Sequence, residues 1–177
     1  MNVVTTLKQF DEFLFQRGES FSAVVIGGAA LNVMSIIQRE TIDVDCLEPA
    51  IPETILVAAS EFRKSFPQFG LIEKWINNGP ESLLKELEAG WRSRTVEIYR
   101  GKALHFSSLG RLDLIKTKLF AYCDRDTDLQ DCIALKPTEA ELNDCIAWVS
   151  YRDANPMWPK NVKIHFERLR KHLGYGK

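Results

Sequence analysis

The sequence predicts an α/β (α+β) fold, a small mixed sheet flanked by helices with a helical C-terminal part. Short strand-like segments at 22–26 and 41–47 enclose a stretch with helical character. A third alternating segment follows at 94–99 and a short one at 103–106, and after these the chain has helical spacing. We therefore expect an α/β core over 1–106, with a helical region over 107–177 packed on it.

Hydrophobic spacing and turn residues place the elements of the first half. The apolar stripe that starts at Leu7 follows Thr5 and Thr6, which are plausible N-caps. Pro49 ends the second strand, and the helix after it begins near Pro52. In order, we expect a helix near 7–14, a strand at 22–26, a helix at 29–37, a strand at 41–47 and a helix at 53–66.

The second half is predicted from the same signals. The segment ESLLKELEAG reads as a short helix that ends at Gly90, after a turn at NNGP. Thr138 and Glu141 form a capping box that opens a helix. The further elements expected are strands at 94–99 and 103–106 and helices at 111–123, 138–148 and 161–173.

The bulk composition excludes several classes of protein. Apolar residues make up 45% of the chain, which is enough for a packed core. The 23 basic and 24 acidic residues nearly cancel, so no global charge favours nucleic acid or a membrane surface. No apolar run approaches the roughly 20 residues that span a bilayer, and the N-terminus has no signal-peptide pattern. We expect a cytoplasmic protein without a membrane partner.

The cysteines and histidines do not predict a metal site. Cys46, Cys123, Cys132 and Cys145 form no CxxC pair, and most have apolar neighbours, so buried reduced thiols are expected. The three histidines have no second ligand at helical spacing. The acidic segment DRDTDLQD starts like a calcium loop, but Leu129 stands where that loop needs glycine.

Two carboxylates in RETIDVDCL are the first candidate site residues. Residues two apart in a strand point to the same face, so Asp43 and Asp45 are expected about 6.6 Å apart on one face. Ile42 and Val44 are expected on the other face. Adjacent carboxylates on a core strand need a cation, and Mg²⁺ is the natural one for oxygen ligands. Glu97 is the candidate third ligand, provided that its strand neighbours theirs.

The glycine pair upstream is the second candidate. Gly27 and Gly28 end one strand and open a helix, where free backbone N–H groups favour a phosphate. A phosphate cradle beside a carboxylate pair would suit a metal-bound triphosphate. Ser35, Arg39 and Thr41 lie between the two motifs and are candidates to touch the phosphates or the acidic pair.

Together these motifs resemble the nucleotidyltransferase superfamily. The stretch GGAALNVMSIIQRETIDVD, with Arg39 and Thr41 before the acidic pair, is most similar to its minimal bacterial branch, the MNT and AbiEii-type proteins of toxin–antitoxin and phage-defence systems. The resemblance implies site roles for Gly27, Gly28, Asp43 and Asp45 and an NTP such as ATP as substrate. The two aspartates would hold two Mg²⁺ ions, and Glu97, which no motif fixes, is the candidate to complete the set. Downstream, DLIKTKLFAYCDRDTDLQD also resembles this branch, which implies nucleotide-binding roles for Lys118 and Asp131.

The predicted activity is transfer of a nucleotide from NTP to a hydroxyl of a protein, a tRNA end or a small molecule. The alternative is a catalytically inactive nucleotide-binding module, or one that binds a cognate toxin or antitoxin protein. The same residues also have purely structural interpretations: a solvated strand face for the aspartates, a tight turn for the glycines, and an exposed strand residue for Glu97. The basic last helix could alternatively bind RNA or an acidic partner.

Overall fold

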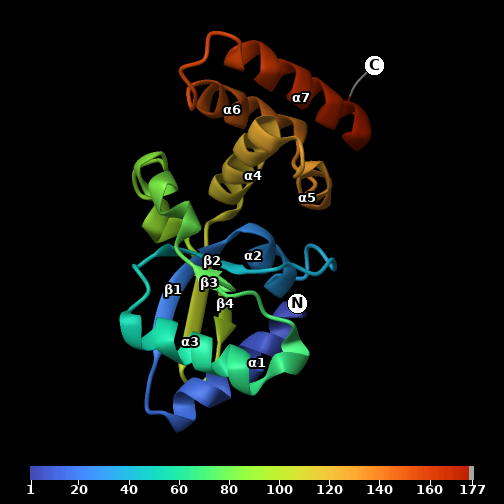
Figure 1. Cartoon of the computed structure of the whole chain (residues 1–177). Helices are drawn as coiled ribbons and strands as arrows, with labels where there is room; N and C mark the ends of the chain where they lie inside the picture. Colours follow the sequence, from blue (N-terminus) through green and yellow to red (C-terminus); the bar gives the residue numbers. More distant parts are fainter. Residues whose placement is uncertain (176–177) are drawn as a thin grey trace. The chain divides into compact units, whose positions relative to one another are not determined.

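The computed structural model describes residues 1–175, which divide into two compact units at Gly110 and Arg111. The first unit holds a five-stranded sheet with helices beside it, and the second is helical (Figure 1). The expected fold class, a small mixed sheet flanked by helices with a helical C-terminal part, is confirmed. Within residues 1–175, no helix combines the length and the apolar character that a membrane crossing requires.

The sheet of the first unit is mixed, with strand order β3-β2-β1-β5-β4. Strand β1 pairs antiparallel with β2 and parallel with β5; β3 is parallel to β2, and β4 is antiparallel to β5. The strand bounds are β1 Phe21–Ile26, β2 Val44–Glu48, β3 Ile76–Asn77, β4 Val96–Arg100 and β5 Leu104–Ser108.

The core of the first unit lies between one face of this sheet and two helices, α1 (Val3–Gln16) and α3 (Glu53–Ser65) (Figure 1). Phe10 of α1 packs edge-on against Trp75, with 4.9 Å between ring centroids. The Trp75 indole N–H donates to the Ala59 carbonyl of α3 at 3.2 Å, so this buried ring has its polar atom satisfied.

Several local expectations were wrong. The N-cap of α1 is Asn2, whose side chain accepts from the Thr5 backbone N–H. Strand β2 begins only at Val44, and Ile42, expected to be buried, is 65% exposed. The segment near Leu83, expected as a short α-helix, forms a 3₁₀ helix, η2 (Gly79–Lys85). Two short elements were missed: β3 and a helix at Leu129–Ala134.

The second unit contains α4 (Arg111–Arg125), α5 (Leu129–Ala134), α6 (Glu139–Ser150) and α7 (Trp158–Leu173). The capping box of Thr138 and Glu141 is confirmed at the start of α6. All four cysteines are free and buried, as expected. Two of the cations on α7 are engaged within the unit, because Arg168 pairs with Asp126 and Arg170 donates to Asn143.

A buried carboxylate on α1 fixes the turn between β4 and β5. The Asp11 carboxylate accepts from the backbone N–H groups of Lys102, Ala103 and Leu104 at 2.7–3.0 Å. A side chain at Gly101 would begin 2.3 Å from the Asp11 carboxyl carbon, so the carboxylate occupies that space. Burial raises the pKa of Asp11, but these three N–H groups outweigh it and the net pKa is lowered.

Replacing Asp11 by asparagine should destabilise the first unit by about 1.5–3 kcal/mol, the contribution of hydrogen bonds to a charged group. Because the folded-state pKa lies below the ordinary value of 3.8, the contribution of Asp11 is complete well above pH 3.8 and is lost as the pH falls through the folded pKa. Urea unfolding at pH 7 and pH 3 should therefore show a smaller difference between Asp11→Asn and the parent at pH 3. An equal difference at both pH values would contradict this account.

Candidate functional site

The glycine pair lies where β1 ends and α2 (Gly27–Val33) begins. Gly27 has a φ of +72°, a conformation that other residues adopt only with strain. A Cβ built on Gly27 would lie 2.7 Å from Oδ2 of Asp45, closer than real Cβ contacts. Glycine is therefore required twice at this position, by the backbone conformation and by the carboxylate that lies against it. The two sequence motifs meet at this contact.

Gly28 brings a second group of predicted residues together. A Cβ on Gly28 would lie 3.2 Å from the Thr41 hydroxyl oxygen and 3.6 Å from a terminal guanidinium nitrogen of Arg39. Thr41 is buried, whereas Arg39 is exposed. The start of α2 is thus bordered by a hydroxyl, a cation and the Asp45 carboxylate, which are groups suited to a phosphate and its counterion.

The alternation of β2 positions Asp45. Val44 and Cys46 are fully buried on the core face, and Asp45 between them is half-buried on the opposite face. Burial raises the pKa of the Cys46 thiol, which faces the core, to about 12.

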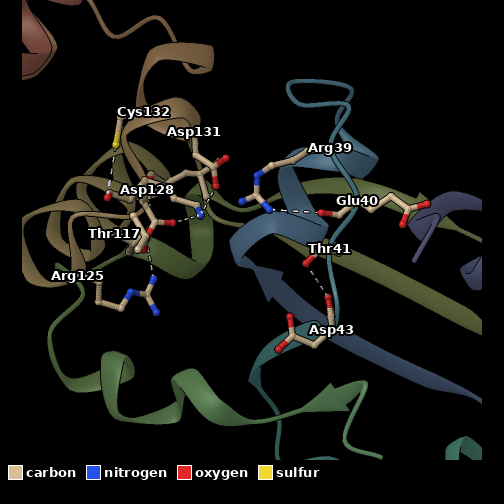
Figure 2. A network of polar contacts seen from close by, with 12 residues as sticks. Arg39, Glu40, Thr41, Asp43, Thr117, Arg125, Asp128, Asp131 and Cys132 are labelled. Atoms are coloured by element: carbon tan, nitrogen blue, oxygen red, sulfur yellow. Dashed lines mark hydrogen bonds and ion pairs between the residues drawn. The ribbon is translucent and has the colours of Figure 1, made fainter. Parts of the chain in front are cut away.

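The other predicted aspartate, Asp43, lies immediately before β2 and is also half-buried. Burial raises the pKa of its carboxyl group above the usual value. The Thr41 hydroxyl donates to the Asp43 carbonyl oxygen at 3.5 Å, a long contact visible in Figure 2. Thr41 and Asp43 therefore both lie in the short segment that leads into β2.

Asn77, which was not predicted from the sequence, lies beside the Asp45 carboxylate on the neighbouring strand. In the β2–β3 ladder Asn77 is the register partner of Asp45, so their side chains share a face. The Asn77 side-chain oxygen accepts from the Gly79 N–H at 2.6 Å. A Cβ on Gly79 would lie 2.7 Å from that oxygen and 3.8 Å from Oδ1 of Asp45, so the amide and the carboxylate border the same small space.

Asn78 fixes this arrangement. Its amide nitrogen donates to the carbonyl oxygens of Cys46 and Pro49, and its oxygen accepts from the Ile51 N–H at 2.8 Å. The segment after β3 is thereby tied to the end of β2, which holds Asn77 in register with Asp45. The only sequence signal for both asparagines was the NNGP turn, because asparagine side chains bond to nearby backbone groups.

The expectation that the strand of Glu97 neighbours the strand of Asp45 is wrong. Glu97 lies on the edge strand β4, and β1 and β5 separate β4 from β2. Three strand spacings correspond to about 14 Å, too far for one shared metal ion. Glu97 instead forms an ion pair with Arg100, which lowers the pKa of Glu97. We therefore leave Glu97 out of the site.

Ser35 also lies away from the glycine pair. It follows the C-terminal end of α2, and seven helical residues place that end about 10 Å from Gly27 by the helical rise. There Ser35 lines a separate cavity of about 390 Å³ with polar neighbours that include Asn32, Gln38 and Glu40.

Lys118 and Asp131, the two predicted residues of the second unit, lie in one buried ionic cluster. The Lys118 ammonium donates to Asp128 at 2.9 Å and to Asp131 at 2.7 Å, and all three side chains are at most 8% exposed. Arg125 donates to the second oxygen of Asp128 (Figure 2). Burial raises the pKa of Asp128, but Lys118 and then Arg125 outweigh it, so the net pKa is lowered. Lys118 thus has its charge balanced within its own unit.

The oxygen donors of the first unit fit a magnesium ion that arrives with a nucleotide. Asp43, Asp45 and Asn77 offer the hard oxygen ligands that Mg²⁺ takes. Among residues 1–175, no group of three or more His, Cys, Asp or Glu side chains could form a metal cage. Mg²⁺ is commonly held by one or two carboxylates, with substrate phosphates and water completing its shell.

Comparison with known families decides the identification. Residues 3–148 match the family described as "Nucleotidyltransferase of unknown function (DUF6036)". The chain belongs to this family. The resemblance to nucleotidyltransferases seen in the two sequence motifs is thereby confirmed, and NTP is the substrate class that the family description implies. No curated protein and no solved structure matches the chain.

Proposed function

We propose that this DUF6036 member is a Mg²⁺-dependent nucleotidyltransferase that moves a nucleotide from a cytoplasmic NTP to a hydroxyl acceptor. The observation that carries the proposal is the contact between Gly27 and Asp45. A glycine turn that a side chain would block stands directly against a half-buried carboxylate, at the start of a helix. A triphosphate and its counterion need these two features side by side.

Each residue of the site has a role in this proposal. Asp43 and Asp45 would hold the cation, and backbone N–H groups at Gly27 and Gly28 would approach the phosphates. Arg39 adds a positive charge beside Gly28, and Thr41 a hydroxyl. When bound, Mg²⁺ would neutralise the triphosphate and lower the pKa of the attacking hydroxyl.

In the proposed reaction, the acceptor oxygen bonds to the α-phosphorus while the bond from that phosphorus to the bridging oxygen of the β-phosphate breaks. The products are the nucleotidylated acceptor and pyrophosphate, and the acceptor hydroxyl proton leaves to solvent. The acceptors that we propose are a protein hydroxyl or a tRNA end. We further propose a toxin–antitoxin setting, which the similarity of GGAALNVMSIIQRETIDVD to that branch supports.

Asparagine replacements of the two aspartates test the proposed activity. With an α-³²P-labelled NTP, Mg²⁺ and total cell RNA or protein, the parent protein should label an acceptor. Asp43→Asn and Asp45→Asn should each lower labelling at least about 100-fold, because the cation site loses half of its charge. Glu97→Gln serves as the matched acidic control and should label normally. Labelling by Asp45→Asn at the parent rate would refute the assignment.

A second candidate function is nucleotide-dependent binding without turnover. It is favoured by one observation: the strand position beside Asp45 carries the neutral Asn77, and no third acid joins the site within residues 1–175. In this case the protein would bind NTP and a partner protein, such as a cognate toxin or antitoxin, and label nothing. Calorimetry with a non-hydrolysable NTP and Mg²⁺ would then show binding by the parent and none by Asp45→Asn, while the labelling assay stays blank for both.

A further inference from the structure

We propose that Asn77 is a positioning residue that keeps the cation site weak until a nucleotide arrives. This inference rests on the proposed function, because it concerns the same carboxylates. Asn77 offers a neutral amide at the strand position directly beside Asp45. The proposed cation site of Asp43 and Asp45 would then carry the charge of two carboxylates, and phosphate oxygens of the nucleotide and water would complete the shell of the cation.

The geometry around Gly79 supports this role. The Asn77 side-chain oxygen is held by the Gly79 N–H at 2.6 Å, which orients the amide in one direction. That oxygen and Oδ1 of Asp45 both lie within 4 Å of the point where a Gly79 side chain would begin. Gly79 is exposed, and Asn77 and Asp45 are half-buried, so this space opens to solvent. The amide is thus fixed at the edge of the cation site.

An acid at residue 77 would fit the same contacts. Aspartate is isosteric with asparagine and keeps an oxygen that accepts from the Gly79 N–H, so Asn77→Asp retains the turn. It also adds a negative charge on the shared face with Asp45. The contacts of residue 77 therefore do not require a neutral amide. The effect of the amide is electrostatic, because free Mg²⁺ is attracted by two carboxylate charges and not by three.

The test compares the affinity for Mn²⁺ by calorimetry, with and without a non-hydrolysable NTP. In the absence of nucleotide, Asn77→Asp should bind Mn²⁺ at least about tenfold more tightly than the parent, since ligand charge tunes the affinity of oxygen sites. The ratio of the Mn²⁺ affinity with nucleotide to the Mn²⁺ affinity without it should fall by the same factor. Gln68→Glu, the same amide-to-acid change at an exposed residue of the 3₁₀ helix Pro67–Phe69, should bind Mn²⁺ as the parent does.

The remaining outcomes separate the inference from the proposed function. In Asn77→Asp with Asp45→Asn, the gain should disappear, which shows that both residues act on one cation. If Asn77→Asp unfolds like the parent yet binds Mn²⁺ no more tightly, the inference is overturned. If, in addition, Asp45→Asn keeps the nucleotide-dependent Mn²⁺ binding of the parent, the proposed function fails as well.

Discussion

Alanine at residue 27 is expected to lower nucleotide transfer or nucleotide binding at least about 100-fold, while the chain stays folded. Two effects combine. The left-handed backbone at Gly27 costs about 1–2 kcal/mol for an L-residue, and the new methyl group would overlap Oδ2 of Asp45 at 2.7 Å. The carboxylate must then move away from the turn, and a displacement of about 1 Å can reduce catalysis 100-fold.

Gly28→Ala is the matched control for this substitution. Gly28 does not have a positive φ, and its added Cβ would lie 3.2 Å from the Thr41 hydroxyl, a contact that a small shift relieves. Because Gly28 is also proposed to approach the phosphates, we expect Gly28→Ala to lower the activity, but by much less than Gly27→Ala does. Circular dichroism would show that both variants fold, and the labelling assay would separate them. Equal activities of the Gly27→Ala and Gly28→Ala variants would contradict the role of the contact with Asp45.

Removal of the Lys118 ammonium is expected to have the largest effect on stability. Lys118→Ala removes the ammonium that pairs with the buried carboxylates of Asp128 and Asp131, and breaking a buried ion pair in this way costs about 3–5 kcal/mol. Thermal unfolding of the parent and the variant at pH 7 measures this loss. Lys163→Ala, the same change at an exposed residue of α7, should alter stability by no more than about 0.5 kcal/mol.

The difference in stability between the parent and Lys118→Ala is also expected to depend on pH. In the parent, the lowered pKa of Asp128 means that its ionised form contributes stability above its ordinary pKa, and the contribution is lost as the pH falls through the folded value. In Lys118→Ala, acid instead relieves the buried charges by protonating them. The difference in stability between the two proteins should therefore narrow toward low pH. A constant difference from pH 7 down to pH 3 would show that Lys118 acts through packing alone.

The local features of the site were predictable because their signals are local. Gly27 and Gly28 break an apolar strand, and the alternation around Asp45 is visible in five residues of sequence. The contact between the glycine turn and the carboxylate follows because β1 and β2 are consecutive, antiparallel strands, which pair more often than distant ones. The fold class follows from the same short-range order of elements.

The non-local features were not predictable. Glu97 has the alternation of a strand residue, but strand order decides whether it reaches Asp45, and β5 enters the sheet between β1 and β4. Strand β3 has two residues, too few for any periodic signal, and Asn77 was therefore interpreted as part of a turn. The partners of Lys118 were not predictable either, because helical spacing indicates the helix face on which a residue lies and not which residues it contacts.

The position of a bound cation tests the central claim most directly. We expect a crystal structure with Mn²⁺ and a non-hydrolysable NTP to show an anomalous peak about 2.1 Å from an oxygen of Asp45, the distance typical of a hard octahedral cation. The phosphates should lie against Gly27 and Gly28. A nucleotide bound with its cation elsewhere, and with the Asp45 carboxylate free of it, would contradict the account.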